Sequence, residues 1–174
     1  AFMSALMTSD YDDIDRLAIE INECKHMGID VLPPDVNESF VEFAVVPTGD
    51  PKHDPIRFGM NAVKNVGTGA VEEILRGREQ EKYETLEDFF SKVNPHIVNR
   101  KALESLIKAG AFDRFGSRSQ LMNSIDNCLA FASRVQKESM SGQEDLFGNA
   151  VEVPEHMKPK INLEKSGVEY SPAE

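Results

Sequence analysis

The sequence contains no long apolar run and almost no cysteine. No apolar stretch approaches the roughly 18 residues that a membrane-spanning helix needs, and the amino end lacks the basic-then-apolar order of a signal peptide. The two cysteines, Cys24 and Cys128, lie far apart, with no CxxC pattern and no histidine at metal-ligand spacing beside either. We therefore expect a cytoplasmic chain with no membrane partner, no zinc site, and reduced cysteines on apolar helix faces.

A recognisable catalytic set is also missing. Asp10, Asp12, Asp13 and Asp15 are the nearest match to the carboxylates that hold two metal ions in polymerases and nucleases. Acidic residues in such a cluster are typical of a helix start, which is how we interpret them. The histidines are scattered without a nucleophile partner, and no Walker A or Rossmann pattern occurs. We predict no catalytic residue, no metal ligand and no cofactor for the chain itself.

The net charge of −11 argues against nucleic-acid binding, because cations set against phosphates supply most of that affinity. The charges are unevenly distributed, however. Residues 1–55 hold 3 basic and 12 acidic side chains, residues 56–118 hold 11 and 9, and residues 119–174 hold 5 and 9. Only the middle stretch is not acidic, so a polyanion could approach it, and we expect weak binding.

The first part of the chain alternates between helical and extended patterns. Apolar spacing predicts a helix over residues 12–27 that ends at Gly28. Two prolines force residues 31–36 into an extended connector. Residues 40–46 and 56–58, on either side of a Pro/Gly/Asp-rich turn, predict a short two-stranded hairpin.

From Gly59 onward the pattern is helical. A helix, tight turn and helix are predicted over residues 59–75, followed by a helix capped by Thr85 and one that runs from Asn99 to Gly110. A single helix is predicted over residues 117–135.

The predicted fold class is mainly α, with tandem helix pairs of the helix-hairpin-helix type, a small β-hairpin and a flexible carboxyl-terminal tail. After Gln136 the periodicity disappears, and few large apolar groups remain to offset ordering entropy. The predicted segments are residues 1–39, ending in the connector, residues 40–136, holding the hairpin and helix pairs, and residues 137–174, the tail.

The sharpest local feature is the glycine-rich turn within residues 58–74. Gly67 and Gly69 permit unusual backbone dihedrals and carry no Cβ, so main-chain N–H groups at the start of the next helix could approach a phosphate oxygen. Such contacts would hold double-stranded DNA without reading its bases. The predicted DNA-binding residues are Lys64, Asn65, Val66, Gly67, Thr68, Gly69, Arg76 and Arg78.

Two alternatives remain beside this interpretation. The glycines could form only a tight interhelical turn in a structural adaptor without DNA contact. The turn could instead belong to a DNA-repair or RNA-processing enzyme, which would require catalytic carboxylates that the sequence does not show. Glu72 and Glu73 suit the helix dipole but repel phosphate, unlike more basic versions of the motif.

Three stretches carry a family resemblance: ECKHMGIDVLPPDVN at 23–37, GMNAVKNVGTG at 59–69 and NRKALESLIKAGAFD at 99–113. They resemble the alpha subunit of bacterial DNA polymerase III, in the segment that leaves the fingers, the helix-hairpin-helix and the following helix pair. The resemblance covers residues 1–150. It implies a DNA-directed polymerase with other replisome subunits as partners, whose magnesium-binding aspartates lie upstream of Ala1, so this chain alone should not polymerise.

The last segment contains QEDLFG at 143–148. It resembles the pentapeptide by which replication proteins dock on the bacterial sliding clamp. Leucine and phenylalanine could fill an apolar pocket while glutamine orients the peptide. A Leu-Phe pair that merely packs on the domain is the alternative. The predicted clamp-binding residues are Gln143, Asp145, Leu146 and Phe147.

Overall fold

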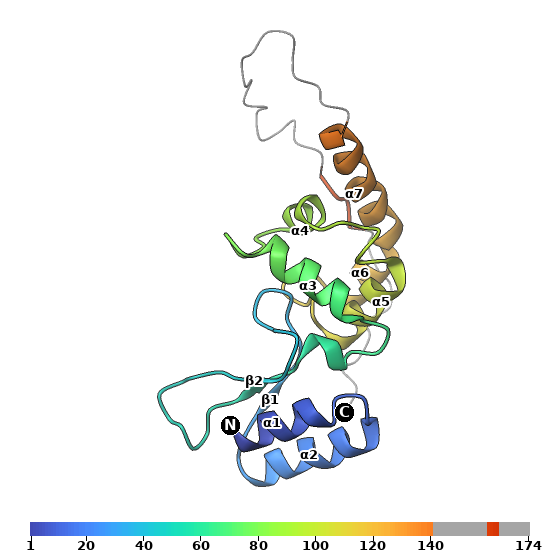
Figure 1. The fold of residues 1–174 in the computed structure, drawn as a ribbon. Helices are drawn as coiled ribbons and strands as arrows, with labels where there is room; N and C mark the ends of the chain where they lie inside the picture. The colour runs from blue at the N-terminus through green and yellow to red at the C-terminus, as the bar shows by residue number, and fades with distance from the viewer. Residues whose placement is uncertain (141–159, 164–174) are drawn as a thin grey trace.

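A computed structural model describes residues 1–140 and 160–163, and these residues are mainly helical (Figure 1). The α-helices are α1 (Phe2–Ser9), α2 (Ile14–His26), α3 (Thr68–Gly77), α4 (Leu86–Lys92), α5 (Arg100–Ala109), α6 (Arg118–Asn123) and α7 (Ile125–Met140). The remaining elements are the strands β1 (Val31–Leu32), β2 (Ala44–Val45) and β3 (Ile56–Arg57) and a 3-10 turn, η1 (Met60–Ala62). The predicted mainly α class is confirmed. No helix in the described ranges is long and apolar enough to span a membrane.

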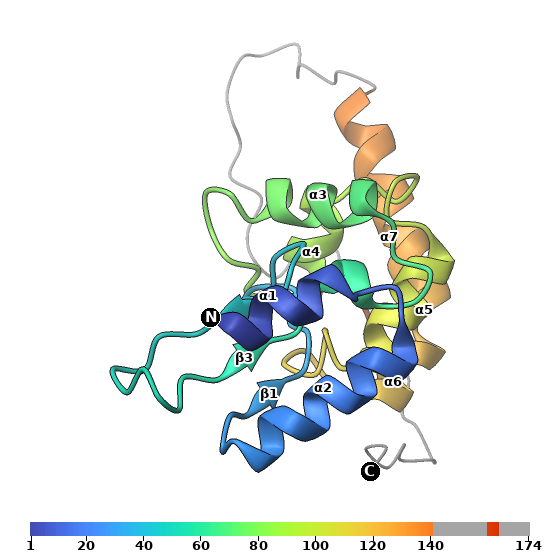
Figure 2. The same cartoon turned by 60° about the horizontal axis from the view of Figure 1, so that its bottom comes forward.

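The molecule has two parts, each with its own apolar cluster (Figures 1 and 2). The amino-terminal unit consists of α1, α2 and the small sheet, and its buried apolar residues are Met3, Met7, Leu17, Cys24, Phe43 and Ile56. The helical unit consists of η1 and α3–α7 around a larger core. In that core the ring of Phe89 packs edge-on against Tyr83 and Phe112, with centroids 4.8 and 4.9 Å away. The hairpin therefore packs mainly with α1 and α2, whereas residues 40–136 were predicted to form one segment.

Local capping explains several helix ends, and the predicted caps are confirmed. The Asp13 side chain accepts the N–H of Arg16 and begins α2. The side chains of Thr85 and Asn99 accept the N–H groups of Asp88 and Ala102, and so begin α4 and α5. Gly110 ends α5 with a left-handed φ of 93°, a conformation that favours glycine.

The sheet has one strand more than predicted. β2 and β3 pair antiparallel as the expected hairpin, and β1 pairs parallel with β3, giving the order β1-β3-β2. Residues 31–36 were predicted to be only a connector, but Val31 and Leu32 lie opposite Ile56 and Arg57 in this ladder. The prolines that follow stop the strand there, because they lack a donor for the ladder.

The single helix predicted over 117–135 is wrong, since the chain breaks at Ser124. Ser117 and Gln120 form a capping box that begins α6, and Ser124 ends it with its N–H donating to the carbonyl of Gln120. The carbonyl of Ser124 then accepts the N–H of Cys128 at 2.9 Å as α7 begins. Apolar periodicity continues across this break, so the pattern alone could not show it.

Two described stretches fall within the tail predicted over residues 137–174, whose flexibility stays a prediction. α7 continues to Met140, and residues 160–163 return to the helical unit, where Ile161 and Leu163 pack against its core. Residues 141–159 and 164–174 lie outside the described residues.

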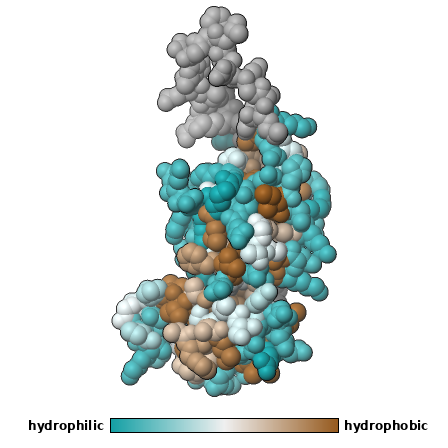
Figure 3. All heavy atoms as spheres, viewed as in Figure 1, coloured by the Kyte–Doolittle hydropathy of each residue, from teal (hydrophilic) through white to brown (hydrophobic). Residues whose placement is uncertain are grey.

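Apolar side chains are also exposed on the amino-terminal unit. Phe2 of α1 and Ile14 and Ile19 of α2 are at least 70% exposed, and Figure 3 shows apolar surface over this end of the molecule.

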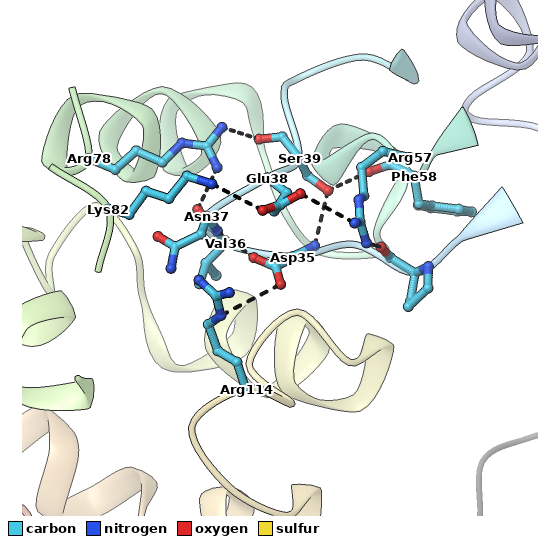
Figure 4. Close-up of polar contacts among 11 residues, drawn as sticks. Asp35, Val36, Asn37, Glu38, Ser39, Arg57, Phe58, Arg78, Lys82 and Arg114 are labelled. Atoms are coloured by element: carbon cyan, nitrogen blue, oxygen red, sulfur yellow. Dashed lines mark hydrogen bonds and ion pairs between the residues drawn. The ribbon is translucent and has the colours of Figure 1, made fainter. Parts of the chain in front are cut away.

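Residues 33–39 connect the two units, and Asn37 is their buried anchor (Figure 4). Its side chain, 4% exposed, donates to the carbonyl of Tyr83 and accepts the N–H of Tyr83, both at 2.8 Å. The hydroxyl of Tyr83 in turn donates to the carbonyl of Ile74 in α3 at 2.6 Å. The amide of Asn37 therefore satisfies both main-chain groups of a residue 46 positions away.

Charged side chains surround the same connector (Figure 4). Arg78, which follows α3, donates to the carbonyls of Val36, at 2.7 Å, and Ser39. Glu38 accepts from Lys82 at 3.1 Å, and this contact with a cation lowers the pKa of its carboxyl. Contacts from the helical unit therefore hold the connector through both its carbonyls and its carboxylates.

We predict that Asn37→Ala lowers the free energy of unfolding by about 2–4 kcal/mol, because two main-chain groups of Tyr83 lose their buried partner. Urea denaturation followed by circular dichroism measures the loss. Asn127→Ala, at an exposed position of α7, is the matched control and should change stability by less than about 0.5 kcal/mol. Equal losses in the two variants would contradict the anchoring role.

Candidate nucleic-acid interface

The glycine-rich turn joins η1 to α3 and is held from below by two buried valines, Val63 and Val66. Residue 64 and residue 65, between the valines, and residues 67–69, after them, are exposed. The helix predicted before the turn is only the single 3-10 turn η1. The predicted contact residue Val66 therefore anchors the turn to the core, and its exposed neighbours form the surface.

The glycines act through their missing side chains and not through unusual dihedrals. Gly67 has φ −83° and ψ 158°, an extended conformation open to most residues, so the prediction of special dihedrals is wrong there. Asn65 has the positive φ of the turn, 66°, which asparagine tolerates better than most residues. A Cβ added at Gly67 or Gly69 would meet no atom within 4 Å. The backbone at both glycines therefore faces open space.

The first turn of α3 offers unpaired donors to this open space. Gly67 is the N-cap and supplies no side-chain acceptor, and its carbonyl accepts only from Ala70 and Val71. The N–H groups of Thr68 and Gly69 have no acceptor anywhere in the described part of the chain. Such donors, together with the positive end of the helix dipole, favour a phosphate oxygen.

Side-chain hydrogen bonds fix the turn to its neighbours. The hydroxyl of Thr68 donates to Asn61 at 3.2 Å, which ties the start of α3 to η1. The amide of Asn65 donates to the hydroxyl of Ser105 at 3.2 Å, which ties the turn to α5. Thr68 and Asn65 therefore fix the exposed backbone in place, although phosphate contact was predicted for both.

The bond to Ser105 identifies two further lysines that the sequence analysis missed. Lys101 and Lys108 lie four residues before and three residues after Ser105, so all three share one face of α5. Both lysines are exposed, as is Lys64 in the turn itself. None of the three lysines forms an ion pair with a described residue. Their spacing along α5 was the available signal, but only the Asn65 contact shows that this face adjoins the turn.

Arg76 is occupied at the other end of α3. Its guanidinium donates to both carboxylate oxygens of Glu73 at 2.7 and 2.8 Å and to the carbonyl of Lys92 at 2.7 Å. Arg76 holds the pKa of the buried Glu73 carboxyl below its ordinary value, and that carboxylate also accepts the N–H of Asn94. This pairing compensates the charge of Glu73, while Glu72 remains exposed.

Arg78 has a structural role in place of the phosphate contact that was predicted. Its half-buried guanidinium is directed at the carbonyls of Val36 and Ser39 in the connector, and burial lowers its pKa (Figure 4). We therefore leave both Arg76 and Arg78 out of the proposed interface. Sequence proximity to the turn had suggested them, but α3 carries them to its opposite end.

The acidic cluster of the amino-terminal unit has a structural explanation. Asp13 caps α2, and Asp10 pairs with Arg16 at 2.9 Å. Glu20 is buried nearby, and burial raises the pKa of its carboxyl. Within residues 1–140 and 160–163, no three His, Cys, Asp or Glu side chains lie in a position to hold a metal ion.

The remaining predicted residues fall into two groups. Cys24 and Cys128 are buried on helices, as predicted, and burial raises the pKa of the Cys128 thiol to about 12. Gln143, Asp145, Leu146 and Phe147 lie outside the described residues.

Comparison with known proteins agrees with this geometry. The model of the helix-hairpin-helix motif family matches residues 28–121, a range that includes the connector, the turn and α5. DNA polymerase III subunit alpha of Campylobacter jejuni is 42% identical over 148 residues, which is 84% of this chain and 12% of the relative. The subunit from Thermus aquaticus is 41% identical over 88% of this chain, and that from Escherichia coli is 38% identical over 90%.

These relatives are much longer proteins, since the chain spans only 12–14% of the length of the first of them. The similarity nevertheless extends over both structural units, because it covers 84–99% of the chain. The family match covers more than half of the chain. The chain therefore belongs to the helix-hairpin-helix motif family, in the form similar to a segment of DNA polymerase III subunit alpha.

Proposed function

We propose that the chain is a non-catalytic segment of a replicative polymerase and that it binds duplex DNA by its phosphates. The observation that carries the proposal is the open start of α3, where the N–H groups of Thr68 and Gly69 lack acceptors. Lys64 lies beside these donors, and Lys101 and Lys108 lie on the face of α5 that adjoins the turn. Together they form a small cationic surface with fixed main-chain donors.

This surface is suited to holding DNA without reading its sequence. Main-chain donors and lysines recognise phosphate oxygens, which are the same at every base pair. Binding by a few phosphates would position the duplex while leaving it free to slide as a polymerase advances. With a net charge of −11 the whole chain opposes the polyanion, so we expect low affinity from this segment alone.

The similarity to polymerase subunits favours this function over the two alternatives. A repair or RNA-processing module would share the turn, but the resemblance to polymerase III alpha extends well beyond it. The exposed lysines around the turn favour DNA contact over a structural adaptor, in which the unpaired N–H groups would only bind water. We further propose that polymerisation, with its magnesium ions, and the contacts to other replisome subunits belong to the rest of a longer cytoplasmic protein.

We also propose that residues 143–147 dock on a sliding clamp. Leu146 and Phe147 would be the apolar anchors, Gln143 would orient the peptide, and Asp145 would complete the motif. Joined to a DNA-binding unit, a weakly binding peptide gains effective concentration, because clamp and segment meet on the same duplex. The support is the sequence match, together with the similarity of the chain to a replicative polymerase.

We predict that Gly67→Val weakens duplex binding at least about tenfold while the fold is retained. Valine can adopt the φ and ψ of Gly67, and its Cβ would meet no atom within 4 Å, so the fold should be retained. Its methyl groups should cover the N–H groups of Thr68 and Gly69. A loss of one such charge-assisted contact, about 1.5–3 kcal/mol, corresponds to roughly ten- to hundredfold. Fluorescence anisotropy with labelled duplexes of two unrelated sequences measures it, and circular dichroism checks the fold. Unchanged affinity would contradict backbone contact.

We predict that Lys64→Gln with Lys101→Gln makes the slope of log affinity against log salt shallower by about 1.8, which is 0.9 for each lost phosphate contact. The matched control is Lys25→Gln with Lys52→Gln, which removes the same charge from exposed positions of the amino-terminal half. The control should leave the slope nearly unchanged. If both pairs of substitutions change the slope equally, the change comes from the lower net charge, and the proposed phosphate contacts of Lys64 and Lys101 are refuted.

We predict that Leu146→Ala with Phe147→Ala abolishes binding to a purified sliding clamp, since each buried anchor contributes about 1.5–3 kcal/mol. Isothermal titration of the full chain measures this, and duplex binding should persist. Val151→Ala with Val153→Ala removes a comparable apolar pair nearby and should leave clamp affinity unchanged. Equal clamp affinity of the wild type and the Leu146/Phe147 variant would refute the docking proposal.

A further inference from the structure

Residues 160–163 lie against the helical unit as a short extended segment (Figure 1). Its residues alternate in exposure: Lys160 and Asn162 are exposed, while Ile161 and Leu163 are partly buried and pack on the core. This period of two is that of an extended peptide lying on a surface with every second side chain turned inward. We call these four residues the returning segment.

A directional hydrogen bond fixes the returning segment in register. The main-chain N–H of Ile161 donates to the carboxylate of Glu87 at 2.7 Å, across 74 residues of sequence. Glu87 lies in the first turn of α4, where an acidic side chain also suits the helix dipole. A charged acceptor makes this bond stronger than one between neutral groups.

A missing side chain on the helical unit makes room for Leu163. A Cβ placed on Gly116, just before α6, would lie 3.3 Å from the Cδ1 atom of Leu163 and 3.9 Å from the Cγ atom of Leu121. Leu163 therefore sits directly over Gly116, beside a fully buried leucine. Apolar packing over Gly116 and Leu121 and the charged acceptor of Glu87 together define the surface that the returning segment covers.

We propose that this surface is a docking site for an extended peptide with an apolar-x-apolar pattern, and that its occupant is this chain's own Ile161-Asn162-Leu163. The chain is then attached to the helical unit a second time, beyond the end of α7 at Met140. The motif at residues 143–147 lies between these two attachment points in the sequence. Docking on this surface depends on neither DNA nor clamp binding, so it can be tested separately from both.

The test is hydrogen exchange of the full chain, read at the amide of Ile161. Bonding to Glu87 should slow exchange at this amide at least about tenfold relative to an unprotected amide. Glu87→Ala removes the acceptor, and Gly116→Val fills the floor under Leu163, so each should return Ile161 to the unprotected rate. Amides of α5, such as that of Leu106, report whether each variant remains folded.

A control variant distinguishes loss of the Ile161 contact from a general loss of structure. Val151→Ala with Val153→Ala shortens another apolar-x-apolar pair and should leave the protection of Ile161 intact. Leu163→Ala should abolish that protection. An Ile161 amide that exchanges at the unprotected rate in the wild type would overturn the proposal. So would protection that survives both Glu87→Ala and Gly116→Val while α5 stays protected.

Discussion

The arrangement of the two units depends on how the connector between them satisfies its backbone. Consecutive prolines at 33 and 34 remove donors and exclude helix, so the carbonyls that follow need partners from elsewhere. Asn37 provides one link, by bonding both main-chain groups of Tyr83, and Arg78 provides the other, by donating to two connector carbonyls. Arg78 is the C-cap of α3, so these contacts hold the carboxyl-terminal end of that helix. The proposed phosphate site lies at its other end.

The chemistry of the proposed phosphate site depends on how the charged side chains of α3 are paired. At the inner end, Glu73 and Arg76 neutralise each other and bind main-chain groups around α4, so the proposed DNA contact does not include them. At the outer end, glycines replace capping side chains, and two N–H groups remain unpaired. The helix therefore offers phosphate its dipole and backbone donors, with lysines from the turn and α5 around them, inside a chain that is otherwise acidic.

Local signals in the sequence predicted the parts of this structure that local forces determine. The caps at Asp13, Thr85 and Asn99 and the glycine end of α5 could be predicted, because each depends on residues no more than three positions away. The break at Ser124 could not be predicted, because the apolar face continues through it. The roles of Arg78 and of the α5 lysines depend on contacts about 40 residues away in sequence, which spacing cannot show.

The proposed function requires that the backbone at the start of α3 touches phosphate. Titration of the isotope-labelled chain with duplex DNA, followed by NMR of its amide groups, tests this most directly. We expect the amides of Thr68 and Gly69 to shift most, those of α5 around Ser105 to shift less, and that of Arg78 not to shift. Shifts centred on the Arg78 end of α3, with Thr68 and Gly69 unmoved, would contradict it.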